Sequence, residues 1–90
     1  MMIRRRYLVS GRVQGVGFRA TTSAVARNFR VVGSVKNLSD GRVEIVVEAE
    51  VEQIEAFIDA VQSAMKANIS DLETHCESMT GEFSRFGVSG

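Results

Sequence analysis

The fold is decided by residues 31–48, which read VVGSVKNLSDGRVEIVVE. Two valine-rich segments flank Asp40-Gly41, a dipeptide that tolerates the positive φ angles required by a tight antiparallel turn. Val31–Asn37 and Val43–Glu48 are therefore predicted to be strands that pair directly as a hairpin. Everything before and after this hairpin has to be arranged around it.

The flanking segments add strands and helices on both sides of the hairpin, and the spacing of their apolar residues distinguishes the two. The predicted strands are Ile3–Ser10, Leu72–Met79 and a short Glu82–Val88, and the predicted helices are Phe18–Arg30 and Val51–Met65. The order strand, helix, strand, strand, helix, strand is that of an α+β, ferredoxin-like split βαβ two-layer sandwich. We expect an antiparallel sheet with both helices on one face, a short extra C-terminal strand, and a single domain over residues 1–90.

The composition excludes several classes of function. Eleven basic and eleven acidic residues give a net charge of zero, so no global field attracts a nucleic acid. Arg4-Arg5-Arg6 interrupts the N-terminal apolar stretch and argues against a signal peptide or a membrane segment, so we expect a cytoplasmic protein. With one cysteine, Cys76, and one histidine, His75, neither a disulfide within the chain nor a His/Cys metal site is expected. We expect Cys76 to be buried and His75 to be exposed.

The most informative segment for function is Gly11–Arg19, which reads GRVQGVGFR and joins the first strand to the first helix. Glycines allow positive φ and remove Cβ atoms, so that successive N–H groups can converge on an anion. The start of a helix adds further N–H groups and partial positive charge. Arg19 is disfavoured there by the helix dipole unless an anion lies between them. The segment matches neither the nucleotide P-loop nor the dinucleotide fingerprint.

Asn37 is the second candidate, at the end of the second predicted strand. An asparagine before a turn commonly serves only the turn. If the third strand lies between the first two, however, these two run parallel and end at the same edge of the sheet. Asn37 would then approach the glycine segment, where its carboxamide could orient a water molecule.

Both segments resemble the two signatures of the acylphosphatases, namely Gly11–Arg19 and GSVKNLSDGRVE over residues 33–44. The resemblance covers nearly the whole chain and implies a monomeric hydrolase that cleaves acyl phosphates to carboxylate and phosphate without a metal or cofactor. It implies that Arg19 and Asn37 are the catalytic residues, with Asn37 placing the attacking water. The residues implied to bind the phosphate are Gly11, Arg12, Val13, Gln14, Gly15, Val16 and Arg19.

This sequence departs from the family pattern at three places: Ser34 replaces a common bulky aromatic, Leu38 replaces a hydroxyl residue, and 66–71 lacks a proline. Two other functions stay open. The chain could be a non-catalytic anion-binding regulatory module of the same fold. It could also bind nucleic acid through the arginine run, although the zero net charge and the lack of interleaved aromatic residues on that strand argue against this.

Overall fold

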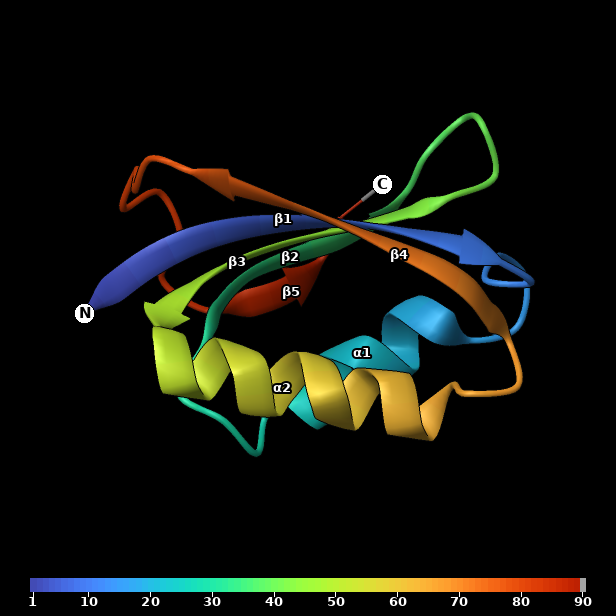
Figure 1. Cartoon of the computed structure of the whole chain (residues 1–90), viewed down its shortest axis with the longest axis horizontal. Helices are drawn as coiled ribbons and strands as arrows, with labels where there is room; N and C mark the ends of the chain where they lie inside the picture. The colour runs from blue at the N-terminus through green and yellow to red at the C-terminus, as the bar shows by residue number, and fades with distance from the viewer. Residues whose placement is uncertain (90) are drawn as a thin grey trace.

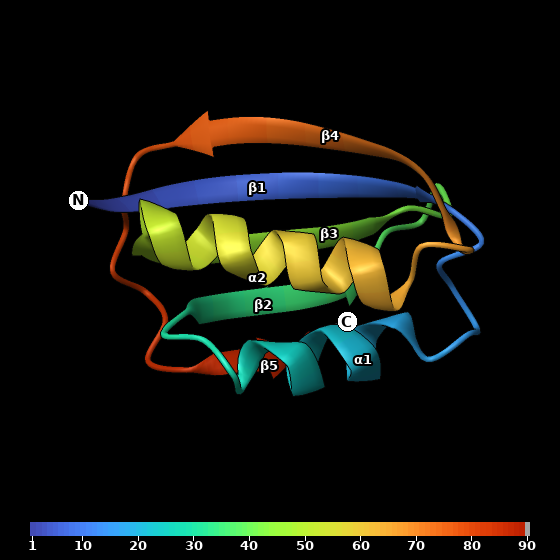
Figure 2. The same ribbon diagram turned by 60° about the horizontal axis from the view of Figure 1, so that its bottom comes forward.

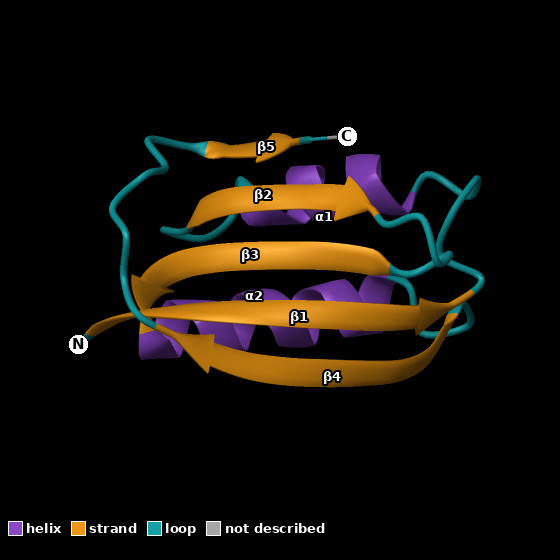
Figure 3. Cartoon of the chain, turned by 90° about the horizontal axis from the view of Figure 1, so that it is seen from above, coloured by secondary structure: helices purple, strands orange, loops and turns teal. Residues whose placement is uncertain are grey.

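The computed structural model describes residues 1–89, which form a two-layer sandwich with one sheet and two helices (Figure 1). The elements are β1 (Met2–Gly11), α1 (Phe18–Ala26), β2 (Val32–Asn37), β3 (Val43–Glu50), α2 (Val51–Ala64), β4 (Ile69–Glu77) and β5 (Phe86–Val88). The strand order is β4-β1-β3-β2-β5. Both helices cover the same face of the sheet, and the opposite face carries none (Figure 3). The predicted α+β, ferredoxin-like architecture is confirmed.

The hairpin forms as predicted and sets the topology. β2 pairs antiparallel with β3 from Val32 opposite Glu48 to Asn37 opposite Val43, and Gly41 in the connecting turn has a φ of 93°. β3 also pairs antiparallel with β1. Because β3 lies between them, β1 and β2 run parallel and end at the same edge of the sheet (Figure 3). The glycine segment and Asn37 are thereby brought to one end of the molecule.

The hydrophobic core lies between the sheet and the two helices (Figure 2). Tyr7 and Val9 face it from β1, because alternate residues of a strand point to the same side. Residues at helical spacing on α2, including Ile54, Phe57 and Val61, are fully buried against them. The predicted apolar stripe of this helix is confirmed.

The end of α1 and both ends of β4 differ from the predicted boundaries. α1 ends at Ala26, and the N–H groups of Asn28 and Phe29 bind the carbonyls three residues earlier at 3.0 and 3.1 Å, so the chain tightens into turns. β4 begins at Ile69 rather than residue 72, because its first residue already pairs with Gly11 of β1. It ends at Glu77, before the chain turns toward β3.

The C-terminal strand is shorter than predicted and pairs differently. β5 covers only Phe86–Val88 and runs parallel to β2, so the sheet is mixed rather than purely antiparallel. Glu82 and Phe83 lie outside it because both contact Arg4. The Arg4 Nη1 atom donates to the Glu82 carboxylate at 2.9 Å, and the Arg4 guanidinium lies 5.6 Å from the centre of the Phe83 ring.

The expectation that Cys76 is buried is wrong: its side chain is exposed. β4 is an edge strand, and α2 lies over the inner strands (Figure 2). Alternation along the sequence shows which residues share a face, but it does not show whether a helix covers that face. Among residues 1–89, no helix is long and apolar enough to cross a membrane.

Candidate functional site

The site is built on the loop that follows β1. Gly15 and Gly17 adopt positive φ angles of 75° and 77°, and Gly17 is the N-cap of α1. A Cβ atom at either glycine would meet no other atom within 4 Å, so both expose bare backbone to open space. Among residues 1–89, the N–H groups of Gly15, Val16 and Gly17 donate no hydrogen bond. This arrangement of free N–H groups at a helix start suits an anion.

Gly11 has a different role from the other two loop glycines. A Cβ atom there would lie 2.2 Å from the carbonyl oxygen of Asn68, so the position is occupied by the neighbouring backbone rather than open to a ligand. The adjacent N–H of Arg12 donates to that same carbonyl at 2.9 Å. Gly11 and Arg12 therefore attach the loop to the start of β4.

Two side chains hold the loop in place. The Asn68 Nδ2 atom donates to the Arg12 carbonyl at 3.0 Å. From the other side, the Gln14 Nε2 atom donates to the carbonyls of Leu38 and Arg42 at 2.8 and 2.9 Å, which ties the loop to the β2–β3 turn. Sequence reasoning missed Asn68, because nothing in its local sequence distinguishes it from a surface asparagine.

Arg19 and Asn37 meet in one hollow beside this loop. The hollow has a volume of about 250 Å³, and it is called the loop hollow below; it is lined by Val13, Gly15, Gly17, Phe18, Arg19, Ala20, Asn37 and Val88. Of these described residues, Arg19 alone is charged. The structure thus brings together the two predicted catalytic residues with Val13 and Gly15 of the predicted cradle, whereas Gly11, Arg12, Gln14 and Val16 lie outside the lining.

Asn37 presents an unusual polar atom near the loop hollow. Its Oδ1 atom is buried and has no hydrogen-bond partner within residues 1–89. A buried acceptor without a partner is costly, and such atoms commonly bind an ordered water or a ligand. Asn37 thus lines the loop hollow and carries a polar atom that the described residues leave without a partner.

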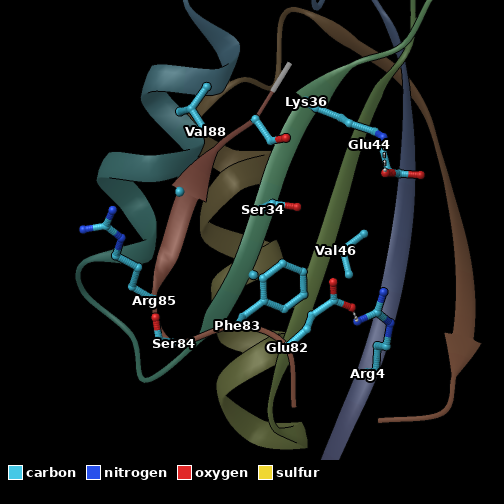
Figure 4. Close-up of a pocket in the computed structure, with 13 residues that line it drawn as sticks. Arg4, Ser34, Lys36, Glu44, Val46, Glu82, Phe83, Ser84, Arg85 and Val88 are labelled. Atoms are coloured by element: carbon cyan, nitrogen blue, oxygen red, sulfur yellow. Dashed lines mark hydrogen bonds and ion pairs between the residues drawn. The ribbon is translucent and has the colours of Figure 1, made fainter. Parts of the chain in front are cut away.

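A larger hollow than the loop hollow lies elsewhere. It has a volume of about 490 Å³ and opens on the helix-free face of the sheet, where Ser34 and Val46 project from β2 and β3 (Figure 4). It contains neither Arg19 nor Asn37. Its charges are largely paired internally, since Lys36 faces Glu44 at 3.8 Å and Arg4 faces Glu82 at 2.9 Å. The smaller loop hollow, which contains both Arg19 and Asn37, is therefore the better candidate for the functional site.

The arginine run does not form a free basic patch. Arg4 contacts the buried carboxylate of Glu48 at 2.9 Å and the carboxylate of Glu77 at 3.0 Å. Arg6 donates to the second oxygen of Glu77 at 2.7 Å. Within the part of the chain that the structure describes, no group of three or more His, Cys, Asp or Glu side chains is arranged to hold a metal ion.

Comparisons with known proteins show the family to which the chain belongs. The acylphosphatase family model matches residues 5–88. An acylphosphatase of Borrelia garinii subsp. bavariensis is 41% identical over 91 residues, which cover 97% of this chain and 98% of that protein. An acylphosphatase of Methylococcus capsulatus is 39% identical, with 97% and 96% covered.

Solved structures give the same result. The crystal structure of acylphosphatase from Bacillus subtilis superposes with a TM-score of 0.86 at 32% identity, and all of both chains is covered. The crystal structure of full-length HypF, in a phosphate- and nucleotide-bound form, superposes with a TM-score of 0.83 at 31% identity. The match covers all of this chain but only 12% of the HypF chain. Since family model, full-length relatives and fold coincide, the chain belongs to the acylphosphatase family.

Proposed function

We propose that this enzyme hydrolyses the carboxyl-phosphate bond of small acyl phosphates in the loop hollow. The observation that carries the proposal is that free backbone N–H groups, Arg19 and Asn37 line one hollow at the edge of the sheet. Each supplies a different requirement of phosphoryl transfer, namely binding of the oxygens, neutralisation of charge and placement of the nucleophile.

The phosphoryl group is held by the loop that runs from Gly11 to Arg19. Gly11, Arg12 and Gln14 fix the loop, and Val13 packs it into the core. The N–H groups of Gly15 and Val16, with those at the start of α1, donate to the phosphoryl oxygens. Arg19 adds a planar guanidinium that pairs with two oxygens at once.

Asn37 orients the attacking water. Its Oδ1 atom, which has no hydrogen-bond partner within residues 1–89, accepts a hydrogen bond from that water and so orients a lone pair of the water oxygen toward phosphorus. The new P–O bond forms as the bond between phosphorus and the carboxylate oxygen breaks, and the carboxylate leaves with the electron pair. The proton lost by water passes to the phosphoryl oxygens, so no side chain is needed as a base. The products are a carboxylate and inorganic phosphate.

Kinetics of four variants with acetyl phosphate test these roles. Arg19→Ala is expected to lose more than about a hundredfold in kcat/KM, with a weaker affinity for inorganic phosphate, because charge stabilisation is removed. Asn37→Ala is expected to lose about a hundredfold in kcat with little change in KM, because it acts on the water rather than on substrate binding. Arg27→Ala and Asn28→Ala, two exposed residues just after α1, are the matched controls and should keep full activity.

Full activity in both site variants, or no phosphate release by the wild-type protein, would contradict the proposal. A non-catalytic anion-binding module gives a separate result, because calorimetry would show phosphate binding that depends on Arg19 without any turnover. No observation in the loop hollow favours that function over hydrolysis.

The protein is further proposed to act as a monomer in the cytoplasm on a small-molecule substrate, without a nucleic acid, membrane or cofactor. The edge strand β4 supports the monomer, because its exposed Asp71 and Glu73 are charges of the kind that keep an edge strand from pairing with another copy. Sedimentation at micromolar concentration should give the mass of one chain, and a dimer would contradict this part.

A further inference from the structure

We infer that Val88, together with Ala20, contacts the acyl group of the substrate and makes the enzyme prefer uncharged aliphatic acyl phosphates. The inference rests on the proposed function, since it assigns the part of the loop hollow that the phosphoryl group and the water do not use. It concerns a residue of the last strand, far in sequence from both motifs.

The lining of the loop hollow divides by chemistry. Gly15, Gly17 and Arg19 offer donors to the phosphoryl oxygens, and Asn37 offers an acceptor to water. Of the remaining residues, Val13 and Phe18 are each only 1% exposed and belong to the core. The apolar surface that a substrate can reach is therefore that of Ala20 and Val88, both of which are exposed.

β5 places Val88 beside the site. Val88 pairs with Val35 of β2, whose fully buried side chain points into the core on the helix face. Asn37 lies two residues further along β2 and so shares that face. The Ser89 N–H donates to the Val35 carbonyl at 2.8 Å, which holds the end of the segment against β2. Figure 4 shows Val88 on the outer side of β5, away from Ser34.

The exposure of Val88 is itself informative. At 52% exposed, it is one of few large apolar side chains open to solvent among the described residues, and it borders a hollow built for a polar ligand. An acyl chain laid against it would remove apolar surface from water. Each buried methylene is worth up to about fourfold in affinity. A second anionic group on the acyl chain would meet an apolar wall.

Binding of acylphosphonates tests the inference, because their C–P bond is not hydrolysed. Affinities of acetyl-, propionyl- and butyrylphosphonate are measured by calorimetry on the wild-type protein, Val88→Ser and Val32→Ser. The wild type is expected to gain up to about fourfold per methylene, and Val88→Ser is expected to lose most of that gain. Val32→Ser is the matched control, a half-buried strand valine that does not line the loop hollow, and it should keep the gain.

A variant that adds a positive charge at position 88 tests the inference independently. Val88→Lys should bind succinylphosphonate, which carries a carboxylate as a second anionic group, at least about tenfold more tightly relative to butyrylphosphonate than the wild type does. Circular dichroism confirms that the variants fold.

An unchanged gain per methylene in Val88→Ser, or a wild type that does not discriminate chain length, would overturn the inference. Failure of the proposed function gives a different result: the protein would still bind the phosphonates but would release no phosphate from acetyl phosphate.

Discussion

At the scale of single residues, the glycines of one loop serve opposite purposes. Gly11 is required because the backbone of Asn68 occupies the space of its Cβ atom, at 2.2 Å. Gly15 has open space around it and is required for its φ of 75° and for the approach of a ligand to the backbone. The same residue type therefore contributes to stability at one end of the loop and to binding at the other.

Alanine substitutions should separate these two roles. Gly11→Ala is expected to lower the free energy of unfolding by about 3 kcal/mol, because β1 and β4 must move apart. Gly15→Ala should cost only about 1 kcal/mol for its left-handed conformation. It should nevertheless reduce kcat/KM for acetyl phosphate roughly a hundredfold, since the new methyl group displaces the phosphoryl group. Urea unfolding and phosphate release measure the two effects; equal stability losses would contradict the distinction.

At the scale of elements, the segment between β4 and β5 is held by one buried carboxylate. Glu48 of β3 is 1% exposed and accepts hydrogen bonds from Arg4, from the N–H and hydroxyl of Thr80, and from the N–H of Gly81. These contacts start the path of the chain back across the sheet to β5. The ion pair between Arg4 and Glu48 thus lies at the far end of the sheet, at the start of the segment that leads to β5. That strand carries Val88, which lines the loop hollow.

The Glu48 carboxylate should make the free energy of unfolding depend on pH. Burial alone raises the pKa of Glu48, but the donors from Thr80, Arg4 and Gly81 outweigh it and hold the pKa below its ordinary value. A lowered folded-state pKa gives stability that is fully present above the unfolded pKa of about 4.3 and is lost as pH falls through the folded value. Glu48→Gln is expected to lose about 2 kcal/mol at pH 7.

The difference in the free energy of unfolding between the wild type and Glu48→Gln should become smaller in acid, because the wild type there loses the contribution of the ionised carboxylate. Urea unfolding at several pH values between neutral and pH 3 measures both curves. Glu82→Gln is the control, because its carboxylate contacts the same Arg4 but is half exposed, and it should change stability by less than about 1 kcal/mol. A loss from Glu48→Gln that stays constant with pH would show that the carboxylate charge is not the cause.

At the scale of the whole molecule, binding and stability are coupled. A small domain has only a modest free energy of unfolding, and a ligand that binds only the folded state adds to it. The loop hollow exists only when α1, β2, β5 and the loop after β1 are assembled, because its lining comes from these four segments. Occupation of the site should therefore stabilise the entire fold.

Inorganic phosphate is expected to raise the free energy of unfolding by about 2.7 kcal/mol at a concentration one hundred times its Kd. The Arg19→Ala variant should show little of this effect at the same concentration. Sodium chloride at matched ionic strength is the control for general salt effects. Equal stabilisation of wild type and variant by phosphate would mean that the anion acts away from the loop hollow.

Much of this architecture could be predicted because it depends on local sequence. The Asp40-Gly41 turn and the apolar spacing of α2 are set by residues within a few positions of one another. The boundaries of β4 and β5 could not be predicted, because they depend on pairing with Gly11 and Gly33 elsewhere in the chain. The exposure of Cys76 likewise depends on which strands the helices cover.

The sequence by itself determined the order of the elements, the glycine loop, and the identity of Arg19 and Asn37 as residues of interest. These follow from periodicity and from residue types whose chemistry is intrinsic. Only the tertiary structure showed that Asn68 anchors the loop, that Glu48 pairs with Arg4, and that Val88 borders the site. Each of these contacts joins residues more than forty positions apart, so their proximity arises from sheet pairing and packing rather than from any local pattern.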